Sequence, residues 1–419
     1  MEKHLPLRLS DCLELDSQLN SESALADAIK RFHPGQEATL YFDANSIGPM
    51  PRHAPEKLQE VLEAGWALAR RRSWNKFDWL EQPQHLGASI AHLIGAAQNN
   101  VIVCDTTSIN QYKLLRFALK TQSPKRVVVI EKNVFPSNSY IAQCLENDNL
   151  AELRFISDSS ELPKALEPND VAVVTLSHVD YRSSMRLDLL NLSSLIREAG
   201  ALSLWDLSHS AGAVAVDLRS SNADLAVGCG YKYLCGGPGA PAYMYVHPRL
   251  LNDVWPAIGG WMGHSYTFSF DPDYLPNSGI KRFLVGTPSV LSNVAFSAAA
   301  DIWRGINPQA MEQRHKSLTN TLIQLIEERC GGWNLKLASP KSHSDRGGHV
   351  AFQFEHSEKL AQALVHHGVV VSSRKPDALR WGVHPLATTH EQIWCAVEIL
   401  RMILESQIWQ DARFNAPSI

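Results

Sequence analysis

The sequence predicts an α/β protein in which helices cover a mainly parallel central sheet and a smaller α+β unit follows. Between residues 101 and 227, short apolar runs alternate with polar or helical stretches, as is typical of parallel strands joined by crossover helices. These runs occupy residues 101–104, 127–130, 171–176, 202–205 and 224–227. After residue 290 the pattern changes to long helices and then to shorter strand-like runs, which indicates a second unit.

The elements before the sheet are expected to be mostly helical. Residues 21–32 carry polar caps followed by apolar residues at helical spacing, and residues 39–42 form a short strand-like run. A longer helix is predicted over residues 51–72. Its apolar face, expected to be buried, consists of Leu58, Val61, Leu62, Trp66 and Leu68.

The elements after the sheet complete the smaller unit. The predicted helices cover residues 291–306, 309–329, 359–366 and 391–405, and the predicted strands cover residues 335–337, 349–354 and 369–372. We therefore expect three parts in the chain. Residues 1–45 are an N-terminal segment that joins the small domain, residues 46–295 form the large domain, and residues 296–419 form the small C-terminal domain.

Composition and charge favour a small-molecule partner. The 419 residues are 45% hydrophobic and carry a net charge of −4, which suits two or three buried cores and gives no reason to expect nucleic acid or an anionic membrane. The seven cysteines include no C-x-x-C pair, and no histidine pair stands at metal-ligand spacing beside carboxylates, so no disulfide framework and no metal are expected. Because no secretory leader and no apolar run of about 18 residues is present, we expect a cytoplasmic protein.

The stretch from Ala223 to Ala242 carries the first chemical signal. An apolar run at residues 225–227 leads into a segment rich in glycine and proline, and Lys232 lies within that segment. A lysine that is partly removed from water gives up its proton more readily and can act as a nucleophile at neutral pH. Such an amine is suited to forming a Schiff base with a carbonyl compound.

A carboxylate upstream makes this hypothesis more specific. The apolar run at residues 201–205 ends in Asp206, one strand and one connection before Lys232. Pyridoxal 5′-phosphate (PLP) requires a lysine for its aldehyde and an acid for its pyridine nitrogen. Taken singly, Asp206 reads more simply as a turn cap and Lys232 as a surface lysine, but the two together with the glycines favour a PLP site.

Further candidates for cofactor contacts follow the ends of the predicted strands. Thr107 and Ser108 begin a helix after the first strand, where free amides and hydroxyls suit a phosphate, although simple N-capping is the alternative. Phe135 follows the second strand and offers a face for ring stacking, and Ser177 follows the third. His209, three residues after Asp206, is either a contact to the phosphate or pyridine side or a structural histidine.

The two central motifs carry a family resemblance. Residues 205–213 and 227–241 resemble kynureninase, a PLP-dependent hydrolase of the aminotransferase fold type I. The resemblance extends over most of the chain. It includes residues 41–49, 135–137, 259–264, 282–288 and 379–385.

The resemblance implies a reaction and roles for three residues. The expected activity is hydrolytic Cβ–Cγ cleavage of L-kynurenine to anthranilate and L-alanine, in the pathway of tryptophan catabolism that also feeds NAD biosynthesis. Lys232 is expected to hold PLP and to remove the substrate α-proton, and Asp206 to stabilise the protonated ring. Tyr231 is the expected proton donor and partner of the developing oxyanion.

The resemblance also assigns substrate contacts and a homodimer. Arg380 is expected to clamp the α-carboxylate, while Trp74, Asn45 and Thr287 belong to the substrate pocket. Trp261 and Thr287 are expected to reach the cofactor site of the neighbouring subunit. Family members that prefer kynurenine tend to carry Thr at the position of Thr287, and those that prefer the 3-hydroxy compound tend to carry Asn.

Three departures from the family pattern leave alternatives open. The chain has Asn138, Asp180 and Ser184 where family members commonly have Asp, Asn and Gly. A cysteine desulfurase-like or aminotransferase-like PLP enzyme would share Asp206, His209 and Lys232. A non-catalytic regulatory protein of the same fold would look nearly identical in sequence.

Overall fold

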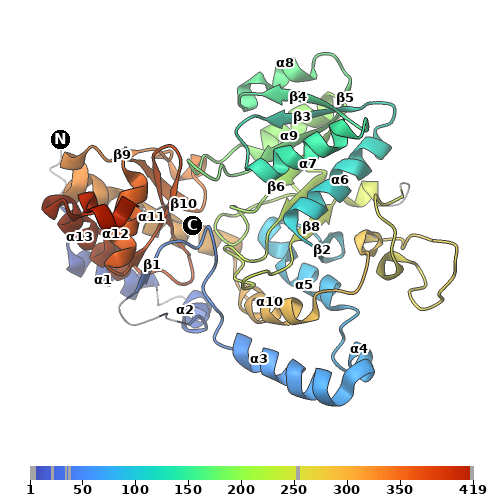
Figure 1. The fold of residues 1–419 in the computed structure, drawn as a ribbon, viewed down its shortest axis with the longest axis horizontal. Coiled ribbons are helices and arrows are strands. Elements are labelled where there is room, and N and C mark those ends of the chain that lie inside the picture. The colour runs from blue at the N-terminus through green and yellow to red at the C-terminus, as the bar shows by residue number, and fades with distance from the viewer. Residues whose placement is uncertain (1–5, 20–22, 34, 36–38, 252–254, 416–419) are drawn as a thin grey trace.

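A seven-stranded sheet forms the centre of the protein (Figure 1). The computed structural model describes residues 6–19, 23–33, 35, 39–251 and 255–415. The strand order is β2-β8-β7-β6-β5-β3-β4. The strands are β2 (Val101–Val103), β3 (Val127–Glu131), β4 (Glu152–Ile156), β5 (Val171–Ser177), β6 (Leu202–Asp206), β7 (Leu225–Gly228) and β8 (Tyr243–Val246).

The prediction of a mainly parallel sheet is confirmed. Strands β4, β3, β5, β6 and β7 pair in parallel, and β8 is antiparallel to both of its neighbours. The strands β4 and β8 were not predicted. Strand β4 lies at the edge of the sheet with mostly accessible side chains, so its sequence lacks the apolar run of a central strand.

Helices cover both faces of the sheet because successive strand residues point to opposite sides. Val127 and Val129 belong to a core shared with α5 (Gln82–Ile90), α9 (Leu189–Glu198) and α10 (Val290–Trp303). The alternate residues Val128 and Ile130 belong to a core shared with α6 (Thr107–Thr121) and α7 (Pro136–Asn147). Short helix α8 (Leu162–Leu166) lies between β4 and β5.

The smaller unit consists of helices around a four-stranded sheet of order β12-β13-β10-β9. Its elements are α11 (Pro308–Cys330), β9 (Lys336–Leu337), β10 (His349–Gln353), α12 (Ser357–His366), β11 (Val369–Val370), β12 (Ser372–Arg374), β13 (Ala378–Gly382) and α13 (His390–Ser406). The N-terminal part joins it, since β1 (Leu40–Tyr41) pairs with β11 and α1 (Leu9–Leu19) packs on α13. The domain boundaries at residues 45 and 295 stay a prediction.

Another N-terminal helix, α2 (Ser23–Lys30), corresponds to the helix expected over residues 21–32, of which residues 21 and 22 lie outside the described part. Within the described residues, no helix combines the length and the apolar character needed to cross a membrane.

The helix expected over residues 51–72 is present, but the predicted burial of its apolar face is wrong. It comprises α3 (Ala54–Glu60), a π-helical stretch (Val61–Ala69) and a 3₁₀ turn (Arg70–Arg72), and α4 (Ser73–Lys76) follows. Val61 is buried and Leu58 is partly buried, whereas three of the other predicted core residues are exposed. Their exposed fractions are 42% for Leu62, 63% for Trp66 and 75% for Leu68.

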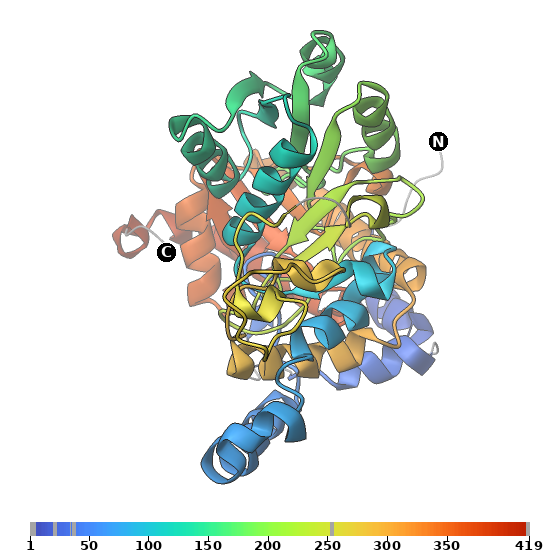
Figure 2. The ribbon, with the colours of Figure 1, turned by 90° about the vertical axis from the view of Figure 1, so that its right-hand side faces the viewer.

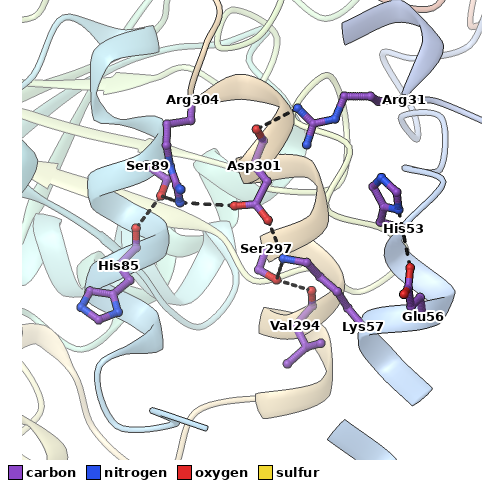
Figure 3. A network of polar contacts seen from close by, with 10 residues as sticks. All are labelled: Arg31, His53, Glu56, Lys57, His85, Ser89, Val294, Ser297, Asp301 and Arg304. Atoms are coloured by element: carbon purple, nitrogen blue, oxygen red, sulfur yellow. Dashed lines mark hydrogen bonds and ion pairs between the residues drawn. The ribbon is translucent and has the colours of Figure 1, made fainter. Parts of the chain in front are cut away.

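The attachment of this helix explains the exposure. At its base, Lys57 forms an ion pair with Asp301 of α10 and donates to the Ser297 hydroxyl at 3.2 Å (Figure 3). Arg304 and Arg31 also contact Asp301, through its carboxylate and its carbonyl oxygen respectively. Beyond this polar junction the helix extends away from the body of the molecule (Figure 2). The segment that follows it packs beside Gly65 through Phe77 and Trp79, which leaves Leu62, Trp66 and Leu68 exposed.

Candidate active site

A cavity of about 550 Å³ lies where the strands of the large sheet end. Most of its wall is made by residues at or shortly after the carboxyl ends of β2, β3, β5, β6 and β7, the edge at which open α/β sheets bind ligands. The predicted site residues that line it are Thr107, Ser108, Phe135, Ser177, Asp206, His209, Tyr231 and Lys232. The structure therefore brings together eight side chains that are scattered along the sequence.

Lys232 lies in a tight turn after β7. The amide of Gly48 donates to the carbonyl of Tyr231 at 2.8 Å, and a Cβ on Gly48 would lie 2.2 Å from the carbonyl oxygen of Lys232. Only glycine allows this approach, because the obstructing atom belongs to the backbone. The loop before α3 thus supports the turn that presents the lysine.

The Lys232 amine meets an imidazole. Its Nζ lies 3.0 Å from Nε2 of His209, which is 7% exposed. Burial, and next the charge of Lys232, hold the pKa of His209 well below its usual value, so the ring is neutral at pH 7. The Nδ1 of His209 is buried and has no hydrogen-bond partner among the described residues, which leaves it available to a ligand.

Asp206 is held at the end of β6 by two donors. The backbone N–H of Ser208 donates to its Oδ1 at 2.9 Å, and the side-chain amide of Asn138 donates to its Oδ2 at 2.9 Å. In the sheet register Asp206 lies beside Ser177 of β5. The carboxylate therefore has a fixed orientation at the edge of the cavity.

One end of the cavity suits an anion. The hydroxyl of Thr106 caps α6 by accepting from the N–H of Ile109 at 3.3 Å, and Thr107 and Ser108 form the first turn. Free amides at a helix start attract negative charge. Below this turn, the buried Lys113 binds the carboxylate of Asp105 and the carbonyl of Phe283, which fastens the helix start to the protein.

Aromatic side chains line the cavity around the lysine. Phe135 contacts Tyr181 edge to face at 5.5 Å between ring centroids. The Nζ of Lys232 lies 5.8 Å from the Phe135 ring and 5.9 Å from the Tyr231 ring. Burial raises the pKa of Tyr231, so its phenol keeps its proton at neutral pH.

Two predicted substrate residues, Arg380 and Asn45, come from the small unit and the N-terminal segment and are not among the residues that line the cavity. Arg380 on β13 is buried and donates to the carbonyl of Tyr181 at 2.7 Å and to the hydroxyl of Ser372 at 3.0 Å. Asn45 packs against the backbone of Gly382. Its two buried amide atoms have no partner among the described residues.

The three remaining predicted residues also lie outside this cavity. Trp74 and Trp261 contact each other at 6.1 Å between ring centroids, and Thr287 is exposed. None of the three is among the residues that line the cavity. The expected contribution of Trp261 and Thr287 to a neighbouring subunit, and of Trp74 to the substrate pocket, stays a prediction.

Sequence reasoning missed several residues at the site. His349 on β10 is buried, its ring centroid lies 5.6 Å from that of His209, and its Nδ1 has no partner among the described residues. Ser46, Ile47 and Tyr181 line the cavity. The sequence signal for His349 was a polar residue at the start of an apolar strand. That signal could not place the His349 ring beside His209, because this contact depends on how the two units pack. In the described part of the chain, no group of three His, Cys, Asp or Glu side chains could hold a metal ion.

Comparison with known proteins identifies the family. The model of the kynureninase C-terminal domain matches residues 311–400. Over 413 residues the chain is 40% identical to the kynureninase of Pseudomonas fluorescens, covering 97% of this chain and 98% of that protein. The chain belongs to the kynureninase family. The kynureninase of Burkholderia mallei is 42% identical over 381 residues, which are 90% of this chain and 91% of that protein.

Solved structures confirm the predicted fold type I. A cysteine desulfurase from Thermococcus onnurineus has a TM-score of 0.74 at 18% identity, covering 91% of this chain and 98% of that one. The K223A mutant of C-DES, whose structure has glycine covalently linked to the PLP cofactor, also has a TM-score of 0.74 at 18% identity, covering 88% and 98%. At 18% sequence identity, the similarity to these two structures is evidence for the fold alone.

Two departures from the kynureninase pattern have a local explanation. Ser184 has a φ of +63°, a conformation that suits the glycine common in the family and costs other residues about 1 kcal/mol or more. Its hydroxyl accepts the N–H of His349 at 3.3 Å. Asp180 accepts the N–H groups of Arg182 and Ser183 at 3.1 and 2.7 Å, so it stabilises the same turn from within.

Proposed function

We propose that this protein hydrolyses L-kynurenine to anthranilate and L-alanine with PLP carried on Lys232. The observation that supports this most is the convergence of Lys232, His209 and Asp206 on one cavity in a chain of the kynureninase family. When bound, PLP supplies an electron sink for the carbanion formed at the substrate α-carbon.

The residues present fit that cofactor. The unpartnered Nδ1 of His209 and the first turn of α6 at Thr107 offer donors to an anionic group. Asp206, already oriented by two donors, offers an acceptor to a protonated ring nitrogen. Phe135 offers an aromatic face on the same cavity.

The protein side chains divide the proton transfers between them. The free amine of Lys232 would take the α-proton, and neutral His209, 3.0 Å away, would stabilise the resulting ammonium. Water adds to the γ-carbonyl carbon, and the Cβ–Cγ bond then breaks with its electron pair left on Cβ. Cβ takes up a proton to give L-alanine, and the γ-carbon leaves as the carboxylate of anthranilate. Tyr231, which keeps its proton, donates to the γ-oxygen as negative charge develops there. Arg380 now donates to the Tyr181 carbonyl and the Ser372 hydroxyl. It binds the substrate α-carboxylate when that carboxylate replaces these two acceptors.

Anthranilate fluorescence tests the activity. Purified holoenzyme mixed with L-kynurenine is expected to release anthranilate and L-alanine in equal amounts. Sulfide released from cysteine would instead support a desulfurase, and a keto acid formed without anthranilate would support an aminotransferase. No turnover of any of these substrates by PLP-loaded protein would support a regulatory role.

Substrate preference is expected to favour L-kynurenine over 3-hydroxykynurenine. Thr287 lacks the amide that could pair with an extra buried hydroxyl, and leaving that hydroxyl unpaired costs roughly 1–3 kcal/mol. The expected ratio of kcat/KM is therefore about ten- to a hundredfold, and Thr287→Asn should narrow it. Steady-state kinetics with both substrates measure the ratio, and an equal or reversed preference in the wild-type enzyme contradicts the assignment.

We further propose a homodimer. The helix of residues 54–72 and the loop around residues 266–275 project from the body of the molecule (Figure 1), and each carries a group of exposed apolar side chains. One consists of Leu62, Trp66 and Leu68, and the other of Tyr266, Phe268, Phe270 and Leu275. Monomers rarely expose such groups, and a second copy of the chain would cover both and bring Trp261 and Thr287 to its own site.

Charge substitution on the projecting helix tests the dimer. Trp66→Lys combined with Leu68→Lys is expected to raise the dimer dissociation constant at least about a hundredfold, because each side chain is buried twice in a symmetric interface. Sedimentation velocity measures the change. Leu190→Lys on α9, another exposed leucine, is the control and should leave the dimer intact. An unchanged dimer in the double variant would place the interface elsewhere.

A cytoplasmic location is proposed as well. The seven cysteines are all free, and several are buried, which suits a reducing compartment.

A further inference from the structure

Asn138 is a buried amide whose side chain reaches the acid of the cofactor site. It lies in the first turn of α7, is 4% exposed, and donates from Nδ2 to Oδ2 of Asp206 at 2.9 Å. Its main chain is fixed separately, since its N–H donates to the carbonyl of Phe135 and its carbonyl accepts from the side chain of Gln111. The side-chain bond to Asp206 can therefore be removed without removing the supports of the helix start.

The geometry points to Asn138 as a positioning residue for the cofactor. We infer that its amide and the N–H of Ser208 hold the two oxygens of Asp206 so that the carboxylate faces the pyridine nitrogen of PLP. Each carboxylate oxygen can accept more than one hydrogen bond, so one donor from the protein still leaves acceptor capacity toward the ring. This inference rests on PLP bound at Lys232, the cofactor of the proposed function.

Within the described part of the chain, Cys229, Tyr231 and Tyr243 are titratable groups that lie close enough to Asp206 to feel its charge. Burial raises the pKa of Cys229, Tyr231 and Tyr243, which keeps these three groups neutral at pH 7. Lys232 is the nearby cation. The aspartate common in the family at position 138 would place a second carboxyl group within hydrogen-bond distance of Asp206, whereas the amide of Asn138 donates without adding charge.

A double-mutant cycle on PLP affinity tests the inference. Asn138→Ala is expected to raise the Kd of PLP roughly ten- to a hundredfold, since the lost hydrogen bond is to a charged group. In an Asp206→Ala background the same change should have almost no further effect, because Asn138 acts through Asp206. Equilibrium dialysis of the apoenzyme with PLP measures each Kd.

A spectroscopic readout separates positioning from general structure. The visible absorbance of the PLP-loaded enzyme is expected to change with pH as the chromophore gains or loses a proton. Asn138→Ala should lower the pH midpoint of this change, because a misaligned Asp206 carboxylate stabilises the protonated chromophore less. Gln111→Ala is the matched control: it removes the bond to the Asn138 carbonyl and should change neither Kd nor midpoint.

Equal effects of Asn138→Ala in both backgrounds, or a Kd within twofold of wild type, would overturn the inference. An effect of Gln111→Ala as large as that of Asn138→Ala would do the same. Both readouts use PLP without kynurenine, so a failure of the proposed kynurenine hydrolysis would leave them interpretable.

Discussion

Lys232→Ala is expected to abolish kynurenine hydrolysis, reducing kcat to less than roughly 10⁻⁴ of the wild-type value. The substitution removes both the amine that carries PLP and the base that takes the α-proton, and no other amine lines the cavity in the described structure. Anthranilate fluorescence measures the rate. Residual activity above one hundredth of wild type would show that another group performs the proton transfer.

The stability of this variant has to be checked beside its activity. Lys232 contacts His209 through a single side-chain hydrogen bond, so its loss should cost only about 1 kcal/mol of unfolding free energy. Thermal unfolding of the wild-type and Lys232→Ala apoproteins measures the difference in stability. A small change in Tm together with complete loss of turnover would assign the effect to chemistry.

Asp206→Ala is expected to have the second largest effect, lowering kcat roughly 10²- to 10³-fold and weakening PLP retention. The carboxylate is the acceptor expected to stabilise the protonated pyridine ring, and two donors already hold it in place. Kinetics at saturating PLP separate the rate effect from cofactor loss.

Asp180→Asn is the matched control for that substitution. Asp180 is a carboxylate in the loop after β5, but its hydrogen bonds stay within its own turn. Its replacement should leave kcat within about threefold, since an amide oxygen can accept the same N–H bonds. Equal losses in the two variants would show that charge anywhere near the site suffices and that Asp206 has no specific role.

The central sheet and the centre of the site could be predicted because their signals are local. Apolar strands that end in polar residues place Asp206 and Ser177 at one edge of the sheet, and the glycines around Lys232 mark a turn that approaches other backbone closely. The strand β8 was missed because it follows that irregular turn.

The rest of the site depends on contacts between distant segments. His349 and Arg380 come from strands of the small unit, and nothing in their local sequence indicates that they contact His209 and Tyr181. The helical spacing of Leu62 and Trp66 correctly predicts a helix and wrongly predicts burial. Periodicity identifies an apolar face without specifying whether the residues that cover it come from the same chain.

Covalent trapping of the cofactor tests the central assignment most directly. Borohydride reduction of the yellow holoenzyme, followed by tryptic digestion and mass spectrometry, is expected to find a reduced pyridoxyl phosphate group on Lys232. Denatured enzyme treated in parallel reports non-specific labelling. Stoichiometric label on the peptide that contains Lys232 is the predicted result, and label on any other lysine, or none on a protein that binds PLP, would contradict it.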